Sequence, residues 1–420
     1  MKRVWDYRVT LVALCTLAFF ATMVARLVIS PVVPEIVETF DSSTGVLGLA
    51  LTGLWMAYAF AQFPSGVLAD RYGERIIILV AIGLTTVASA LLALSPSMPV
   101  FLIFTLILGG VAGLHYSVAT TLLTRELNNI GTAIGLHNSG APLAGLLAPI
   151  AAAAVSQWFG WRAAIALGAV AALPVFVLFR WKVRPTEPAR PEQSMGDRFA
   201  LKPVVELLSR RKIAFTAVLA FLFEFIWQAT ASFLPTFLIA YHGYSVTFAS
   251  ALFSAYFVIQ GLTQPGIGSL SDRYGFASAL FSAYFVIQGL TQPGIGSLSD
   301  RYGREETAGF CAVLGISGFT LLLVGSRLAV LLVGIVLIGV SMGGGAALLP
   351  RFMDNLSDEE RGAGFGLVRT AYMMMSATGS VVVGTIADTA GWGIAFGTFV
   401  VFLSVICLSL VGNRMLDLGF

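Results

Sequence analysis

The stretch GVLADRYGER, Gly66 to Arg75, decides the fold of this chain, because it lies between two apolar segments that are each long enough to cross a bilayer. Its core returns as GSLSDRYG, once from Gly268 and again from Gly296. The motif is a short polar turn, with glycines where backbones approach closely and with Asp and Arg where helix ends carry charge. A turn of this kind in both halves of a chain indicates the hinge of a two-repeat membrane transporter.

The composition indicates the same class independently. Of the 420 residues, 57% are hydrophobic and only 11% are charged, and the mean hydropathy is +0.87. A soluble globule of this size needs more polar residues to cover its surface. We therefore expect an all-α polytopic membrane protein. The net charge of +3 is spread over segment ends instead of forming one patch, which argues against nucleic-acid binding.

The sequence predicts neither a metal site nor a cofactor. Cys15, Cys311 and Cys407 all lie inside apolar runs, without a CxxC pair or a neighbouring His. We expect them to be small buried hydrophobic side chains. The sequence has no GxxxxGK[ST] phosphate loop, so pumping driven by ATP is not expected. We also expect no enzymatic activity.

Apolar runs divide the chain into two bundles. Residues 1–181 hold six expected spans and form the N-terminal bundle. Residues 182–212 are rich in Pro and charge, so we expect a cytoplasmic linker there, with a short surface helix near residues 201–208. Residues 213–420 form the C-terminal six-helix bundle.

The second bundle contains one segment too many. Residues 248–275 are repeated without a change as residues 276–303. Since ancient transporter repeats diverge, a perfect match indicates either a recent duplication or an error in the sequence, and both explanations stay open. We expect twelve core spans, with one copy displaced from the bundle or absent from the natural protein.

Basic residues set the expected orientation. If the N-terminus is cytoplasmic, most Lys and Arg residues between spans lie inside, and the outer side holds chiefly Arg162 and Arg327 together with the acidic Glu35, Glu38 and Asp41. This asymmetry follows the positive-inside rule. We expect a monomer in the cell membrane with both termini in the cytoplasm.

The spacing of glycines and charges resembles the major facilitator superfamily, whose loop between helices 2 and 3 has Gly, three residues, Asp-Arg, one residue, Gly, one residue and Arg. The first loop meets these positions with Gly66, Asp70, Arg71, Gly73 and Arg75. The second half carries the related motif in both copies of its loop. The matching residues are Gly268, Asp272, Arg273 and Gly275 in the first copy, and Gly296, Asp300, Arg301, Gly303 and Arg304 in the second. The resemblance implies two pseudo-symmetric six-helix bundles, closest to prokaryotic twelve-helix porters of organic anions and metabolites.

The same resemblance implies a conformational switch at these loops; the alternative is a simple positive-inside turn. Asp70 would face the N-terminal end of helix 11, at residues 362–366, whose exposed amides attract an anion. Arg75 would pair with Glu126 at the end of helix 4, and the equivalent pair in the second half would be Arg304 with Asp354. These contacts would hold the outward-open state. The residues assigned to the switch are Gly66, Asp70, Arg71, Gly73, Arg75, Glu126, Asp300, Arg301, Gly303, Arg304, Asp354 and Arg369.

Arg26 is the most informative polar residue inside a span, because a charge in hydrocarbon is costly and usually faces a cavity. It lies in ATMVARLVISPVVPEI, eight residues before Pro34. It is similar to the first-helix Arg of organophosphate and organic-anion members of the superfamily, which contacts the anionic group. The alternative is that the helix ends early and Arg26 extends to the outer membrane surface. We expect instead that the first helix continues through Pro31 and Pro34.

Other polar residues inside spans complete the candidate site. Glu224 in helix 7 is a candidate for proton coupling or cation contact, and a structural hydrogen bond is the alternative. For the two His residues and their neighbours, the alternative to a cavity lining is packing between helices. The candidate substrate-binding residues are Arg26, His115, Tyr116, His137, Asn138, Trp227, Gln228 and Tyr372.

Together these features favour a secondary transporter that moves a small organic anion by alternating access, coupled to protons or to a counter-anion. Two departures weaken drug antiport: the helix 5 stretch SGAPLAGLLAP keeps the antiporter motif only in part, and FTLILGGVAGLHY lacks the fourth-helix Arg. A proton-driven drug exporter with Glu224 as the proton carrier remains the alternative. A sensor of the same fold that does not transport is a third class.

Overall fold

The computed structural model describes residues 7–127, 133, 136–188, 202–263, 304–345, 348, 351–352, 355–356 and 363–416. The described residues form helices and no strands. In the N-terminal half the helices are α1 (Tyr7–Leu27), η1 (Ser30–Val32), α2 (Val33–Thr39), α3 (Thr44–Tyr72), α4 (Glu74–Ala93), α5 (Met98–Glu126) and α7 (Gly140–Lys182). The second half holds α8 (Lys202–Ser209), α9 (Arg211–Ala240), α10 (Val246–Thr263), α12 (Arg304–Val324), α13 (Leu328–Ser341), α15 (Ala363–Ser376), α16 (Gly379–Ala390) and α17 (Trp392–Met415).

These helices account for the predicted membrane crossings. Nine helical segments of the described chain are long and apolar enough to span a bilayer, and α10 and α13 are shorter apolar helices. The helix α7 turns back at Gly160, whose φ of 74° breaks the helix into two spans. The described chain therefore supplies twelve crossings, in agreement with the sequence prediction. The short helix α8 occupies the predicted position in the linker.

The first span differs from its expected form. We expected one continuous helix through Pro31 and Pro34, but α1 ends at Leu27 and the chain continues as the short helices η1 and α2. Pro residues occupy the first turn of both short helices, where a missing backbone N–H removes no intrahelical hydrogen bond. The first span is therefore an interrupted helix, and Arg26 lies just before the interruption.

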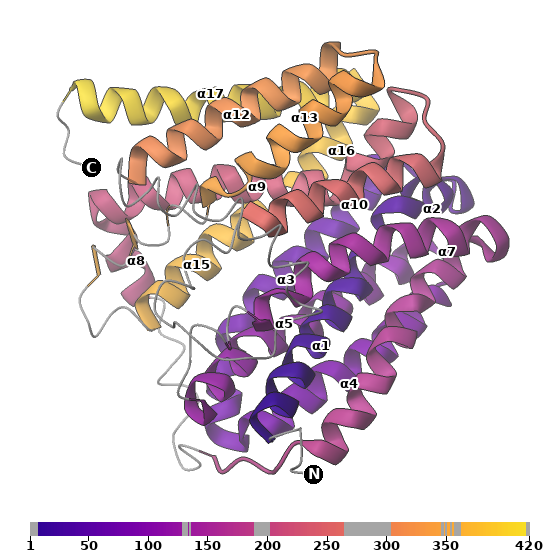
Figure 1. The fold of residues 1–420 in the computed structure, drawn as a ribbon, viewed down its shortest axis with the longest axis vertical. Helices are drawn as coiled ribbons and strands as arrows, with labels where there is room; N and C mark the ends of the chain where they lie inside the picture. Colours follow the sequence, from indigo (N-terminus) through magenta and orange to yellow (C-terminus); the bar gives the residue numbers. More distant parts are fainter. Residues whose placement is uncertain are drawn as a thin grey trace, which may run out of the picture.

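Figure 1 shows that the two halves approach each other at one end of the molecule and diverge toward the other. We call the end that holds Tyr7, Lys182, α8 and Met415 the linker end, and the end that holds Thr39, Thr44 and Ala390 the opposite end. Contacts between the halves join α10 to α7, α15 and α16 to α3, and α9 to η1 and α2. The molecule is thus drawn together at the opposite end.

Glycines allow close helix packing within the N-terminal half. A Cβ atom on Gly109 of α5 would lie 2.0 Å from the carbonyl oxygen of Leu54 in α3, and one on Gly113 would lie 2.3 Å from that of Tyr58. Only residues without a side chain permit such backbone contacts between membrane helices. This packing fixes α3, and with it Tyr58, against α5.

The duplicated segment is described only in part. The helix α10 is built from the first copy as far as Thr263. Residues 264–303, which include the whole second copy, lie outside the described residues. The expectation that one copy is displaced or absent therefore stays a prediction.

Candidate functional site: the interface between the two halves

Arg26 is buried inside the molecule, at the C-terminal end of α1. Its side chain is 3% exposed. The Nε atom donates a hydrogen bond to the carbonyl oxygen of Thr22 at 3.1 Å, and Nη2 lies 2.7 Å from the sulfur of Met23. Both partners precede Arg26 in α1, so the side chain runs back toward the N-terminus of its helix, as helical side chains tend to do. The alternative, in which Arg26 extends to the outer membrane surface, does not hold in this structure.

The positive charge of Arg26 is compensated only by aromatic rings. The guanidinium carbon lies 4.0 Å from the ring centroid of Tyr58 and 5.0 Å from that of Trp55. Among the described residues, no carboxylate forms an ion pair with it. Cation–π contacts contribute about 0.5–2 kcal/mol each, against roughly 2.5–3.5 kcal/mol for placing Arg in a membrane helix. The two ring contacts therefore offset much of the cost of burying this charge.

A second charged group lies across the interface, on helices of the C-terminal half. The guanidinium carbon of Arg369 in α15 is 5.5 Å from the ring centroid of Tyr116 in α5. Glu224 of α9 and Tyr372 of α15 both lie close enough to Arg369 for electrostatic interaction. Arg369 and Glu224 are half-buried. With Arg26, these described residues of the interface carry two guanidinium groups and one carboxylate.

Two tryptophans close this charged region across the halves. The rings of Trp55 in α3 and Trp227 in α9 meet edge to face, with centroids 5.3 Å apart. The Nε2 atom of Gln228 donates to the carbonyl oxygen of Met373 at 3.5 Å. Trp227 Nε1 and Gln228 Oε1 are buried and form no hydrogen bond to another described residue. Buried polar atoms normally have partners, so these two atoms are exceptions to the usual pattern.

The predicted His residues form an aromatic cluster. The rings of His115 and His137 have centroids 5.4 Å apart, and both pack on Phe19 of α1. Tyr116 stacks on His137 with centroids 5.6 Å apart. This geometry places Tyr116 between the His pair and Arg369. Asn138, the remaining candidate of this group, is exposed.

The opposite end is closed by a carboxylate on the N-terminus of α3. Asp388, near the C-terminal end of α16, accepts hydrogen bonds from the backbone N–H of Thr44 at 3.1 Å and of Gly45 at 2.6 Å. The first amides of a helix lack intrahelical partners and favour negative charge. A carboxylate at the C-terminal end of its own helix is unfavourable there, so the sequence did contain a signal that Asp388 serves another helix. Asp388 is nevertheless absent from the residues predicted for the switch.

Thr52 forms hydrogen bonds to the backbone where the eleventh span is interrupted between α15 and α16. Its hydroxyl donates to the carbonyl oxygen of Ala377 at 2.9 Å and accepts from the N–H of Val381 at 3.0 Å. Ala377 lies between the end of α15 and the start of α16. Backbone groups left open where the helix is interrupted are therefore satisfied by a side chain from the other half of the molecule.

Two glycines let the halves touch backbone to backbone at this end. A Cβ atom on Gly48 of α3 would lie 2.5 Å from the carbonyl oxygen of Ser380, and one on Gly384 of α16 would lie 2.7 Å from that of Thr44. Ser30 and Ser232 add a further hydrogen bond between the halves, at 2.8 Å. The close fit is specific to a state in which the opposite end is shut.

At the linker end, Arg75 binds the end of α7. Its backbone N–H donates to Thr186 Oγ1 at 3.0 Å, and its guanidinium group donates to the carbonyl oxygens of Val183 at 2.8 Å and Arg180 at 2.7 Å. These carbonyls belong to the unpaired last turn of a helix. Gly73, with φ +86°, has a hypothetical Cβ only 2.6 Å from the carbonyl oxygen of Thr186, which explains the glycine at this position of the motif.

The ion pairs at the linker end differ from those we expected. Arg75 does not pair with Glu126 in this structure; Arg125 instead binds the buried Glu74, with Nη1 2.8 Å from Oε1, and Glu126 lies 4.0 Å from Arg125 Nε. The second half repeats the arrangement, because Arg351 Nη2 lies 2.8 Å from Oε1 of Glu305. The expected helix ends do meet, but the roles of the residues are exchanged. The acid is Glu74 or Glu305 in the first turn of a helix, and the base is Arg125 or Arg351. An acid in the first turn is favoured by the helix dipole.

The remaining switch residues are described unevenly. Asp70 is half-buried in the last turn of α3, and the guanidinium carbon of Arg71 lies 5.6 Å from the ring centroid of Tyr72. A Cβ atom on Gly66 would meet nothing within 4 Å. Arg304 begins α12. Asp300, Arg301, Gly303 and Asp354 lie outside the described residues. The switching role of these loops stays a prediction.

Replacing Asp388 with Asn is expected to open the opposite end. The substitution keeps the shape of the side chain but removes the charge that faces the amides of α3, a change of about 0.3–2 kcal/mol. The ratio of closed to open molecules at this end should fall by up to about thirtyfold. Spin labels at the exposed Glu38 and Arg327 would report a longer distance between the halves. Asp388→Glu should restore the closed distance, whereas unchanged distances in the Asn variant would remove this role.

The fold and this interface define a class: a polytopic helical membrane protein with two six-helix halves that enclose a charged region between them. The chain belongs to the Major Facilitator Superfamily, whose sequence model matches residues 15–279 and 275–414. The two matches overlap at residues 275–279, where the second copy of the repeat begins. A bacterial homolog of the human lysosomal transporter Spinster has the same fold, with a TM-score of 0.74, 15% identity and 98% of each chain covered.

Curated relatives match shorter stretches. The chain is 26% identical over 241 residues to a hexuronate transporter of Bacillus subtilis, a match that covers 54% of this chain and 56% of that protein. It is 29% identical over 173 residues to a probable sulfoacetate transporter of Cupriavidus necator, covering 40% of each chain. A membrane sensor protein of Escherichia coli, UhpC, is 27% identical over 154 residues, covering 36% of this chain and 35% of that protein. The chain thus spans about half, or less, of the length of the relatives it matches.

Proposed function

We propose that the protein is a secondary transporter that moves a small organic anion across the cell membrane by alternating access, with both termini in the cytoplasm. The observation that carries this proposal is the buried guanidinium of Arg26, which is 3% exposed and contacts the rings of Tyr58 and Trp55. A permanent charge held inside the bundle without a described carboxylate is explained by a ligand that brings the negative charge.

The contacts between the halves support the transport cycle. Asp388, Thr52 and Ser30 join the halves toward the opposite end, and the halves diverge at the linker end. If the linker end is cytoplasmic, this is the inward-facing state. In the alternate state the predicted contact between Asp70 and the start of α15 would form at the linker end. A solute held near Arg26 would then face each side in turn.

The relatives support an organic acid as the solute. Hexuronate and sulfoacetate, named for two of them, both carry an acidic group on a small polar body. In this chain the acid would bind Arg26, where the planar guanidinium offers paired donors to a carboxylate, sulfonate or phosphate. Trp227 Nε1 and Gln228 Oε1, which have no other described partner, would bind polar groups on the body of the solute.

Glu224 would couple transport to protons. Its carboxylate lies close enough to Arg369 for electrostatic interaction, and protonation would free that guanidinium for the anion. We expect wild-type protein in proteoliposomes to take up hexuronates or sulfonates faster when the outer side is acidic. Glu224→Gln should keep anion counterflow but lose this pH dependence. The exposed Glu306, which pairs with Arg414 at 3.0 Å, supplies the matched control, and Glu306→Gln should keep the dependence. Unaltered pH dependence in Glu224→Gln would favour exchange for a counter-anion.

Two other functions have some support, and the same assay separates them. The match to UhpC favours a sensor that does not transport, and a sensor would bind the anion without counterflow. A multidrug resistance protein B homolog of Mycobacterium tuberculosis is 28% identical over 152 residues, and a drug exporter would move lipophilic cations with Glu224 essential and Arg26 dispensable.

A further inference from the structure

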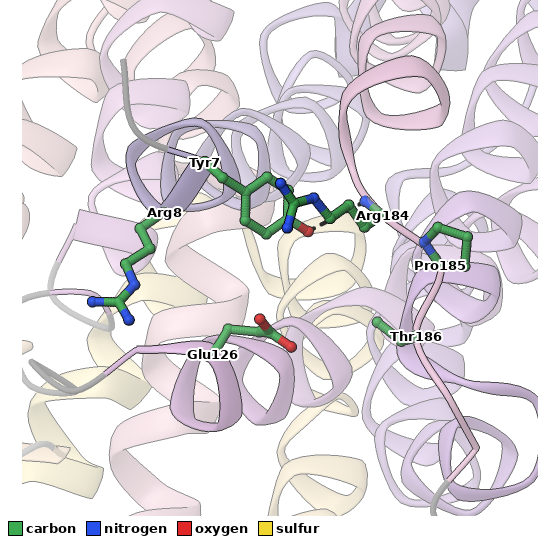
Figure 2. A pocket seen from close by; sticks show the side chains of 6 residues that line it. All are labelled: Tyr7, Arg8, Glu126, Arg184, Pro185 and Thr186. Carbon is green, nitrogen blue, oxygen red and sulfur yellow. Dashed lines mark hydrogen bonds between the residues drawn. The ribbon is translucent and has the colours of Figure 1, made fainter. Parts of the chain in front are cut away.

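A pocket of about 380 Å³ opens at the linker end of the N-terminal half, away from the interface between the halves. It lies where α1 begins, α5 ends and the chain leaves α7. Figure 2 shows the six residues around it, with the Arg184 side chain extended over the Tyr7 ring and with Arg8 and Glu126 on the neighbouring ends of α1 and α5. The lining residues are Tyr7, Arg8, Glu126, Arg184, Pro185 and Thr186.

The pocket presents charges of both signs. The backbone N–H of Arg184 donates to the hydroxyl of Tyr7 at 3.2 Å, and the guanidinium carbon of Arg184 lies 4.4 Å from the Tyr7 ring centroid. The stacked guanidinium is held in place with its N–H edges free to bind a ligand. Among the described residues, neither Arg8 nor Arg184 forms an ion pair. The side chain of Glu126 is 39% exposed. Its carboxylate lies 4.0 Å from Arg125 Nε, which is a long distance for an ion pair.

The surroundings place this pocket at the depth of lipid headgroups. Trp181, one turn before Arg184, is 75% exposed, and Tyr72 at the end of α3 is 46% exposed. Large amphipathic rings exposed at the ends of membrane spans mark the boundary between hydrocarbon and water. Basic pockets at this level attract lipid phosphates.

We propose that the pocket binds the headgroup of a phospholipid that carries both a phosphodiester and an ammonium group, as in phosphatidylethanolamine. The phosphate would bind Arg8 and Arg184, which can form charge-assisted hydrogen bonds to it. The ammonium would bind Glu126. A headgroup of glycerol phosphate matches the two guanidinium groups but leaves the carboxylate without a cation, so the pocket favours the zwitterionic lipid.

The test is native mass spectrometry of the full-length protein, titrated with phosphatidylethanolamine and phosphatidylglycerol of the same acyl chains. Wild type should retain the ethanolamine lipid more tightly. Arg8→Gln and Arg184→Gln should each weaken that retention about fivefold, the effect of one basic residue near the membrane surface. Glu126→Gln should reverse the preference toward the glycerol lipid. The matched control is Arg211→Gln, since Arg211 is an exposed linker-end residue of the other half, and it should bind as wild type does.

Thermal unfolding midpoints measured without added lipid show that each variant is folded, and soluble O-phosphoethanolamine and inorganic phosphate serve as competitors. The proposal is overturned if Arg184→Gln and Arg211→Gln retain the lipid equally, or if Glu126→Gln leaves the headgroup preference unchanged. It is also overturned if either soluble competitor displaces the lipid at millimolar concentration, since the pocket would then serve a soluble phosphate compound. Retention of the predicted order with no displacement supports the lipid site.

Discussion

Arg26→Gln is expected to abolish anion transport while making the protein more resistant to thermal unfolding. The substitution removes the charge that would hold the anion, so binding and counterflow should be lost together. It also removes a buried guanidinium, 3% exposed, that no described carboxylate balances. Placing that charge in a membrane helix costs roughly 2.5–3.5 kcal/mol, part of which is recovered from the Tyr58 and Trp55 rings. The unfolding midpoint without substrate should therefore rise by a few degrees.

Two further variants make this test specific. Arg26→Lys should bind the anion weakly, because an ammonium group keeps the charge but lacks the paired donors. Arg162 provides a contrast at the opposite end, where Nη2 donates to the carbonyl oxygen of Ser95 at 3.3 Å and the guanidinium carbon lies 4.3 Å from the Trp161 ring centroid. Arg162→Gln should lower stability and leave anion binding intact. Wild-type counterflow in Arg26→Gln would refute the organic-anion proposal.

Gly48→Ala is expected to stop transport by preventing closure at the opposite end. The new methyl group would lie 2.5 Å from the carbonyl oxygen of Ser380, a backbone atom that cannot rotate away. Overpacking of this kind costs about 1–3 kcal/mol. Because α3 and α16 belong to different halves, the cost falls on the closed arrangement and shifts the population away from it by about 5- to 150-fold. A cysteine introduced near Arg26 should therefore react faster with a thiol reagent that is added on the side of the opposite end.

Gly53 supplies a control on the same helix. A Cβ atom there would meet only Leu106 Cδ1, at 3.5 Å, which is ordinary van der Waals contact. Gly53→Ala carries the same change in helix propensity and should transport like wild type. If the two alanine variants behaved alike, the close contact between Gly48 and Ser380 would have no part in the cycle.

The fold followed from the sequence because long apolar runs and polar turns are local signals. The two halves, the short helix α8 and the position of Arg26 inside a span all rest on residues close together in the chain. Residue type alone also indicated that a buried Arg needs a partner. The direction of its side chain did not follow, since that depends on Thr22, Met23 and the rings of α3.

The sequence could not predict which residues form the contacts between the two halves. Asp388 binds Thr44, a residue 344 positions away, and no local pattern specifies which helix end a distant carboxylate meets. The linker-end ion pairs show the same difficulty at smaller scale. The family pattern indicated which helices meet, but a rotation of one residue along each helix decides whether Arg75 or Glu74 faces the partner.

The hydroxyl of Thr52 also has a consequence for the shape of the eleventh span. It supplies hydrogen bonds to Ala377 and Val381 only while α3 lies against the break between α15 and α16. When the halves part, these two backbone groups must bind water or find each other. The flexibility of the break therefore depends on whether the opposite end is shut. When that end is shut, Thr52 holds the break in place through its hydrogen bonds, and when it opens, α15 and α16 can join into one straight helix.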